Sequence, residues 1–463
     1  NEFNNIQKEL NSFNKFKLMG SIFSADMESD DININQYMPN KKSDSRKKKE
    51  FKQDNIIYNL DDSKLIAYLI GNDSECRNIL VSTYITHEKS KYIVISISKN
   101  SFENSQTINT IQFAADSKLQ IIDTNAFCNS SIRSIVIPEN VTEINSYAFY
   151  NCKQLKHVEF HPNSKLQKID DHSFSNTAIE SISIPSNVKE INASAFESCN
   201  HLKHITIPSN SKLKKIGDNA FNGTLIESIT LPSNVELNEL WCCRTKYLNN
   251  VVLLPKSNSC LKYGQNEIII GKSNKSNDIF DAFVFSKRNI KFITIPTFIK
   301  QINSYSLENA LITSIFIPNN ITCIKSGTFS NCRRLQKVEF QSNSQLQIIE
   351  RKTFEWTSIK KISIPEQVTQ IKACAFEFCK KLNYVEIPKN SKLNKIGIYA
   401  FNGSSIKSFF VPSFVNEIGT YALCSDSLQI IEFAINTFLK SIDIDAFPNN
   451  KFLIIMVPSN FKF

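Results

Sequence analysis

A short alternation of apolar and polar positions recurs along most of the chain. One copy reads Ser134-Ile135-Val136-Ile137-Pro138. Alternation with a period of two is typical of a half-buried strand, with its two apolar side chains pointing inward. Proline ends such a strand because it lacks the N–H group that the next ladder hydrogen bond needs. Further copies begin at Ser181, His204, Ser228, Ser314, Lys361, Tyr384 and Ser408, and each predicts one short strand.

An aromatic position follows each strand and sets the repeat length. After the first step its spacing alternates between a shorter step, as from Phe127 to Phe149, and a longer one, as from Phe149 to Phe174. The stretch between strand and aromatic residue, such as Val141 to Phe149, is expected to form a short helical turn or an irregular loop. The position is occupied by Phe102, Phe127, Phe149, Phe174, Phe196 and Phe221, and then by Leu307, Phe329, Phe354, Phe376, Phe401, Leu423 and Phe447.

One such repeat cannot bury its own apolar side chains, but stacked repeats can. A period of about 23 residues lies within the leucine-rich-repeat range of about 20–29. The predicted fold is therefore a strand-dominated α/β leucine-rich-repeat solenoid of about 15 repeats with a parallel concave sheet. Its aromatic residues are expected to form a continuous column, and burying each of them contributes on the order of 1.5–3 kcal/mol.

A larger duplication lies on top of the repeat. The segment that begins at Cys199 and ends at Gly223 matches the segment that begins at Cys379 and ends at Gly403. A second match, at a different offset, relates Ile70-Gly71 to Ile270-Gly271. We interpret this second match as a start segment that the chain uses twice.

The duplications predict the domain organisation. Residues 55–235 are expected to form a first repeat block with its start segment, and residues 263–463 a second such block. Residues 236–262 are expected to join the two blocks. Residues 1–54 show no repeat and combine an acidic cluster with a basic run, so we expect a disordered arm.

Composition excludes several classes of protein. The 463 residues contain only ten glycines, which disfavours glycine-rich phosphate loops. The longest apolar run is Phe452 to Val457, far below the ~20 residues of a membrane-spanning helix. The net charge of +10 is spread thinly outside the run from Lys41 to Lys52, with no aromatic-basic motif. We therefore expect no nucleic-acid partner.

Four cysteines follow the aromatic position by three residues: Cys152, Cys199, Cys332 and Cys379. A free cysteine behaves as a small hydrophobic residue, so we expect a buried repeat position. Cysteines of this column that are two coils apart would be separated by about 10 Å, which exceeds the ~7 Å limit for a disulfide. The pair Cys242-Cys243, at the joint, does not follow this pattern.

These motifs resemble the BspA-like leucine-rich-repeat proteins, a family of surface antigens in oral bacteria and protozoan parasites. The resemblance rests on the Ile-Pro strand ends, the cysteines above and the Ala-Phe pairs, and it covers roughly residues 79–463. It implies a surface adhesin that binds host-cell or extracellular-matrix protein. The Ala-Phe pairs are Ala148-Phe149, Ala195-Phe196, Ala220-Phe221, Ala375-Phe376 and Ala400-Phe401.

No catalytic or cofactor motif stands out in the sequence. Neither H-E-x-x-H nor G-x-S-x-G nor C-x-x-C occurs. His157 and His204 share one outward strand position but are two coils apart, too far to ligate one zinc ion. We therefore expect no enzyme, no cofactor, no metal and no small-molecule substrate.

The outward strand positions are the candidate partner-binding surface, because solenoids bind through extended faces. The second block adds aromatic residues there, and exposed aromatics are enriched at binding hot spots. The same residues can equally stack as ordinary cross-strand pairs. The candidates are His157, Glu159, His204, Thr206, Phe316, Glu339, Tyr384, Glu386 and Phe410, with the patch around Tyr384, Glu386 and Phe410 favoured.

Two functions remain open from the sequence. The first is a non-catalytic adhesin or antigen at the cell surface, as the resemblance implies. The second is an intracellular scaffold or regulatory module, in the cytoplasm, which the unpaired cysteines and the lack of a visible signal peptide or membrane anchor favour. The sequence does not fix an oligomeric state.

Overall fold

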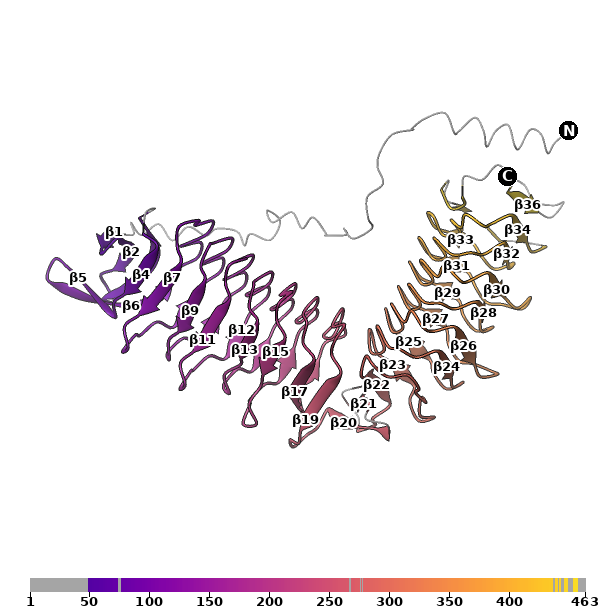
Figure 1. The fold of residues 1–463 in the computed structure, drawn as a ribbon, viewed down its shortest axis with the longest axis horizontal. Helices are drawn as coiled ribbons and strands as arrows, with labels where there is room; N and C mark the ends of the chain where they lie inside the picture. Colours follow the sequence, from indigo (N-terminus) through magenta and orange to yellow (C-terminus); the bar gives the residue numbers. More distant parts are fainter. Residues whose placement is uncertain are drawn as a thin grey trace, which may run out of the picture. The chain divides into compact units, whose positions relative to one another are not determined.

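The computed structural model describes residues 49–456, apart from 74–75, 266–267, 275, 277, 436–437, 440, 443–444 and 449–452. Within this part of the chain the regular elements are all strands (Figure 1). The predicted strand-dominated parallel solenoid is confirmed, without the helical turns that were one of the two expectations for its loops. Most of the predicted arm lies outside the described residues, but its last part forms β1 (Lys49–Gln53).

The first long sheet combines a start segment with a parallel ladder. β1, β2 and β3 are antiparallel, and from β3 onward the strands of the main path are parallel. The strands after β1 are β2 (Ile56–Asp61), β3 (Ile66–Asn72), β6 (Ser90–Ile97), β8 (Ile121–Ile122), β10 (Glu143–Ile144), β12 (Lys168–Ile169), β14 (Glu190–Ile191), β16 (Lys215–Ile216) and β18 (Glu236–Leu237), with β5 (Tyr84–His87) antiparallel to β6.

The second long sheet repeats this plan with a different start. Its first three strands are antiparallel, and the others are parallel. They are β20 (Leu261–Tyr263), β21 (Ile269–Gly271), β22 (Ala282–Phe285), β23 (Gln301–Ile302), β25 (Cys323–Ile324), β27 (Ile348–Ile349), β29 (Gln370–Ile371), β31 (Lys395–Ile396), β33 (Glu417–Ile418) and β35 (Ser441–Ile442).

The strands that the alternation predicts form short sheets. The predicted parallel pairing between coils is present in them, and the longest ladders come from two-residue strands such as Glu143–Ile144. The short sheets consist of β4 (Asn78–Val81), β7 (Thr110–Phe113), β9 (Ser134–Ile137) and β11 (His157–Phe160); β13 (Ser181–Ser183) and β15 (His204–Thr206); β17 (Ser228–Pro232) and β19 (Asn250–Leu254); β24 (Ser314–Ile317) and β26 (Lys337–Phe340); β28 (Lys361–Ser363) and β30 (Tyr384–Glu386); and β32 (Ser408–Val411), β34 (Ile430–Phe433) and β36 (Ile454–Met456).

The predicted column of phenylalanines is present, but in two stretches that belong to separate cores and not as one continuous column. Neighbouring rings from Phe102 to Phe221 stack with centroids 5.0 to 5.9 Å apart, and those from Phe329 to Phe401 do so at 5.0 to 5.3 Å. The turns that carry these rings are also bonded to one another. The N–H of Phe127, for example, donates to the carbonyl of Ala148 at 2.7 Å. Each coil is thus tied to the next at this corner as well as in the sheets.

The corner turns place residues on both sides of the aromatic position in the left-handed conformation. Asparagine tolerates that conformation well, and several copies use it. Asn129 donates its side-chain amide to Asn104 at 3.0 Å, and Asn151 donates to Asn129 at 2.6 Å. Gly327 is needed for another reason: a Cβ atom there would meet the Tyr305 ring at 2.3 Å.

The cysteine column is buried, as the sequence predicts. The thiols of Cys152 and Cys199 donate to the carbonyls of Phe127 and Phe174, one coil earlier, at 3.0 and 3.1 Å. Cys332 and the fourth member of the column repeat this contact. All twelve cysteines of the chain are described, and all are free thiols. The position thus favours a small side chain that donates one hydrogen bond.

The start segment of the second block separates two hydrophobic cores. Ile269, Val284 and Phe285 pack into the core of the first block, whereas Ile270 and Phe283 pack into the core of the second. Side chains on the two faces of this thin sheet line both cores, and a register shift in the pairing of β21 with β22 accompanies the placement of the consecutive Val284 and Phe285 in one core. The chain therefore closes one repeat stack and begins the next with the same strands.

Candidate functional site

The structure places all nine predicted binding residues on the outward positions of the short-sheet strands, which we call the strand face. Eight of the nine are exposed, and Phe410 is half-buried and packs against the core. The neighbouring Phe409 is 1% exposed, so the predicted alternation holds at this strand. The surface the sequence points to is therefore accessible along both blocks.

The strand register decides which candidates meet. Phe316 lies directly opposite Glu339, and Tyr384 lies opposite Lys361. Glu339 also forms an ion pair with Lys337 at 2.7 Å. The Phe316–Glu339 and Tyr384–Lys361 pairs each join neighbouring coils within one short sheet, whereas Lys337 and Glu339 lie on the same strand.

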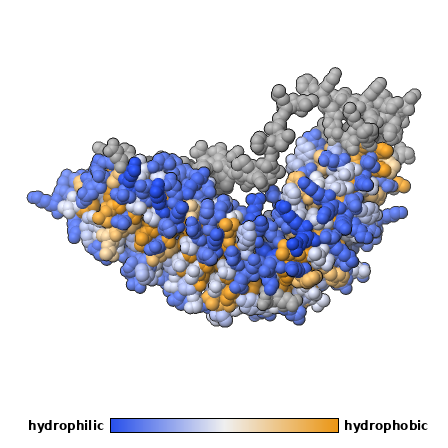
Figure 2. Space-filling model, viewed as in Figure 1, coloured by the Kyte–Doolittle hydropathy of each residue, from blue (hydrophilic) through white to orange (hydrophobic). Residues whose placement is uncertain are grey.

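The first-block candidates lie in other sheets. His157 and Glu159 belong to β11, and His204 and Thr206 belong to β15. On the face shown in Figure 2, hydrophobic residues lie in separate patches among hydrophilic ones. The candidates therefore lie on several short sheets along the two blocks.

The described residues contain a polar hollow and no cluster of metal-ligating side chains. No group of three His, Cys, Asp or Glu side chains among them lies close enough to hold a metal ion. A hollow of about 570 Å³ beside the ends of β11 and β13 is lined mainly by Ser, Asn and Pro, and His161 is its one titratable lining residue. Within the described residues, no helix has the length and apolar character needed to cross a membrane.

Two charged residues are buried where the two blocks meet. Arg288 is 2% exposed and donates from its guanidinium to the carbonyls of Tyr305 at 2.8 Å and Cys242 at 3.1 Å. Glu308 is 1% exposed and accepts a hydrogen bond from the backbone N–H of Arg244 at 2.7 Å. Burial raises the pKa of Glu308 to about 7, although Arg288 nearby acts in the opposite direction.

The pair Cys242-Cys243 is explained by this junction. Thr245 donates to the carbonyl of Cys242 at 2.6 Å, just as Thr177 donates to Phe174 in an ordinary coil. Cys242 therefore takes the place of the column phenylalanine. The neighbouring Trp241 supplies a large aromatic ring in this coil, and its ring centroid lies 5.9 Å from that of Phe285.

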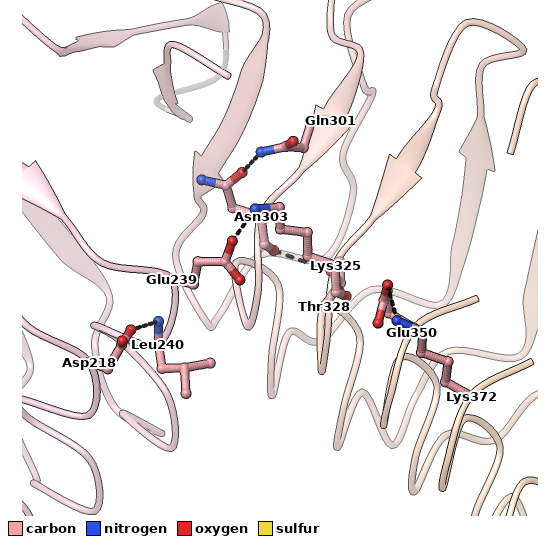
Figure 3. A network of polar contacts seen from close by, with 9 residues as sticks. All are labelled: Asp218, Glu239, Leu240, Gln301, Asn303, Lys325, Thr328, Glu350 and Lys372. Atoms are coloured by element: carbon pink, nitrogen blue, oxygen red, sulfur yellow. Dashed lines mark hydrogen bonds and ion pairs between the residues drawn. The ribbon is translucent and has the colours of Figure 1, made fainter. Parts of the chain in front are cut away.

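A surface contact also joins the two blocks (Figure 3). The Lys325 ammonium pairs with the carboxylate of Glu239, a residue that follows the last ladder strand of the first block. On the next two coils of the second block, Lys372 pairs with Glu350 at 2.8 Å. Lys325 and Lys372 each directly follow a strand of the second ladder, so they occupy the same position of the repeat. At the junction, however, the partner of the lysine is Glu239 of the first block.

Comparison with known proteins decides the family. A model of the BspA type leucine rich repeat region, with six copies, matches residues 77–191, 120–242, 167–265, 257–350 and 347–463. The chain belongs to this family. The sequence resemblance is therefore confirmed. No curated protein shows significant similarity to the chain.

Solved structures share the fold of this BspA-type chain. A leucine rich cell surface protein from Faecalibacterium prausnitzii is 20% identical, with 86% of this chain and 100% of that chain covered and a TM-score of 0.62. The pneumococcal vaccine antigen PcpA is 19% identical, with coverages of 89% and 94% and a TM-score of 0.59. A leucine-rich repeat protein from Bacteroides ovatus is 21% identical, with coverages of 84% and 89% and a TM-score of 0.51. These likenesses establish the leucine-rich-repeat solenoid.

Proposed function

We propose that this chain is a non-catalytic protein-binding solenoid that acts at the cell surface as an adhesin or antigen. Its ligand would be a host-cell or extracellular-matrix protein, bound on the strand face. The observation that carries the proposal is the exposure of aromatic side chains on that face, with Phe316 and Tyr384 each 52% exposed. Large exposed apolar side chains beside charged ones are typical of interaction surfaces.

The patch around Tyr384, Glu386 and Phe410 is the first place to test. Tyr384 and Glu386 point outward from the same strand, and β30, which carries them, lies beside β32, which carries Phe410. Two structural relatives, a leucine rich cell surface protein and a pneumococcal vaccine antigen, support the proposed location for this chain.

The larger duplication of the sequence supplies a matched control. His204 and Thr230 occupy the first-block positions that correspond to Tyr384 and Phe410. Binding of the purified chain to a panel of matrix and host-cell proteins is expected to fall in the variant Tyr384→Ala with Phe410→Ala. The variant Ser228→Ala with Thr230→Ala, which changes two first-block residues of the strand face outside the nine candidates, is expected to bind normally. Equal binding by both variants would remove the patch from the proposal, and absence of binding across the panel would count against an adhesin.

The twelve free thiols favour a second candidate, an intracellular scaffold. Cysteines in an oxidising compartment usually pair, whereas cytosolic proteins keep them reduced. Protease treatment of intact cells separates the two candidates. Cleavage of the chain before the membrane is broken supports the surface protein, and cleavage only afterwards supports the scaffold.

A further inference from the structure

Six basic residues of the second block gather on three neighbouring coils. They lie at the ends of the corner turns and the starts of the short strands, and we call them the basic patch. All six are exposed, and none forms an ion pair with another described residue. The basic patch consists of Arg333, Arg334, Lys360, Lys361, Lys380 and Lys381.

Stacking of the coils brings these residues together. Along the chain the three pairs lie in three successive repeats, far from one another. Neighbouring strands of a solenoid lie about 4.8 Å apart, so three coils place the six charges within a span of roughly 10–15 Å. Such a cluster of like charges is unfavourable in the free protein and favours a partner of opposite charge.

The carboxylates near the patch do not neutralise it. Glu355 is turned toward the corner, where it accepts from Ser330 at 3.0 Å and pairs with Lys352 at 3.6 Å. Glu377 is buried and accepts from Asn402 at 3.0 Å. These two carboxylates are already engaged at the corner. On the neighbouring strands the exposed Glu339 pairs with Lys337, and the exposed Glu386 lies opposite Ser363, so no described carboxylate forms an ion pair with the six cations.

Two aromatic residues hold part of the patch in place. Trp356 and Phe378 stack at 4.5 Å, and both adopt the left-handed conformation, which is unusual for bulky residues. The Arg333 guanidinium lies 5.5 Å from the Trp356 ring centroid, and the Lys380 ammonium lies 5.7 Å from it. Cation–π contacts of this kind orient the charged groups and leave their hydrogen-bond donors free.

The duplicated coils of the first block show that the fold does not require this charge. The corresponding residues are Lys153, Gln154, Glu180, Ser181, Asn200 and His201, which are exposed as well. Their formal charges cancel, with histidine neutral, whereas the basic patch carries six positive charges. The backbone is equivalent: Asn383 donates to the carbonyl of Lys360 at 3.0 Å, and Lys203 donates to that of Glu180 at the same distance. The aromatic pair is likewise specific to the second block, where Asn176 and Ser198 correspond to Trp356 and Phe378.

We propose that the basic patch is a docking surface for a sulfated polysaccharide. A sulfate group keeps its negative charge at every physiological pH, and basic clusters on protein surfaces bind such polymers. The apolar residues between the cations, Leu335, Ile359 and Leu382, are fully buried. Between the cations the surface therefore lacks exposed apolar anchors, apart from Tyr384 opposite Lys361 at its edge, and it suits a polar ligand with many charges.

The same geometry disfavours a single-stranded nucleic acid. Such ligands bind by stacking their bases on open aromatic faces. Trp356 and Phe378 stack on each other and are half-buried, so their faces are not open to a base.

The polysaccharide proposal does not depend on the proposed protein ligand, because the basic patch meets the strand face only at Lys361.

The test compares binding of heparin to the full chain and to two variants. The first variant replaces the patch with its first-block counterparts: Arg333→Lys, Arg334→Gln, Lys360→Glu, Lys361→Ser, Lys380→Asn and Lys381→His. These side chains already occupy equivalent backbone positions, so folding should be retained, and circular dichroism checks this. The control removes the same net charge from exposed first-block sites: Lys99→Gln, Lys118→Gln, Lys153→Gln, Lys156→Gln, Lys203→Gln and Lys214→Gln.

Heparin binding to the wild-type chain should weaken steeply with salt, as for other polyanions. The patch variant should bind about tenfold or more weakly, with a shallower salt dependence, and the control variant should stay close to wild type. An equal loss in both variants, or none in the patch variant, would overturn the proposal. So would equal binding of desulfated heparin, or tighter binding of poly-glutamate or a single-stranded oligonucleotide to the same residues.

Discussion

Glu308 should make the stability of the block junction depend on pH. Its pKa is raised from 4.5 to about 7, chiefly by burial. The folded chain therefore holds this proton more tightly than the unfolded chain does. The resulting stabilisation is complete below about pH 4.5 and is lost as the pH rises through about 7. At about 1.4 kcal/mol for each tenfold change in proton affinity, the loss is roughly 3 kcal/mol.

The variant Glu308→Gln tests this reasoning. Glutamine keeps an oxygen that can accept the hydrogen bond from the Arg244 N–H, but it does not ionise. The difference in unfolding free energy between wild type and variant should therefore change by roughly 3 kcal/mol between pH 4.5 and pH 8, with the wild type losing stability at high pH. Other carboxylates titrate in both proteins, so their contributions cancel in the difference.

Urea unfolding followed by tryptophan fluorescence measures the junction directly. Trp241 lies in the junction and is 3% exposed, and the chain has only one other tryptophan. A Trp356→Phe background therefore makes the emission specific. Glu159→Gln, which removes an exposed carboxylate on a strand, is the control and should show no such pH dependence. A wild-type to Glu308→Gln difference that stays constant between pH 4.5 and pH 8 would refute the assignment of a raised pKa.

Two further predictions concern the repeat itself. Phe174→Ala removes a fully buried ring that stacks on Phe149 and Phe196, and it should lower the free energy of unfolding by about 3–5 kcal/mol. Amide hydrogen exchange should become faster in the adjacent coils than in the second block, and Phe174→Leu should have a smaller effect. A uniform change in exchange along the chain would contradict the local coupling of a solenoid. Burial raises the pKa of Cys199 to about 11, so its thiol should react with a disulfide reagent at pH 8 far more slowly than the partly exposed Cys260, as mass spectrometry of the labelled peptides can show.

The sequence predicts the phenylalanine column and the short strands because both leave a periodic signal. Alternation over four residues, as in Ser134–Ile137, marks a half-buried strand without any alignment. The regular spacing of the phenylalanines then requires that they stack. These features depend on residues that are close in sequence or repeat at a fixed interval.

The continuous ladders could not be predicted in this way. Strands such as Glu143–Ile144 contain two residues, which is too short for any alternation to be visible. Their order becomes clear only once the coils are stacked, when Glu143 lies opposite Lys168, and Lys168 opposite Glu190. The alternating charges along this edge could have served as a signal, had the repeats been compared column by column.

The buried junction charges were also missed, because burial there results from the meeting of distant segments. Glu308 is 64 residues from Arg244, whose backbone N–H it binds, and nothing near Glu308 in the sequence marks it as buried. A buried charge is tolerated only where several polar groups face it. At this junction, backbone carbonyls face Arg288 and a backbone N–H faces Glu308, and no side-chain motif records such partners.

The basic patch shows how stacking changes the meaning of composition. The sequence suggests that the positive charge outside the arm is thinly spread, and in linear order this is so. In the folded chain the pairs Arg333-Arg334, Lys360-Lys361 and Lys380-Lys381 fall on neighbouring coils and become one surface. The first-block copy keeps the same backbone hydrogen bonds with Glu180 in place of Lys360, so the fold itself does not select the charge. A repeat protein can therefore acquire a new binding surface through substitutions in one column, while its buried phenylalanines, alanines and cysteines maintain the stack.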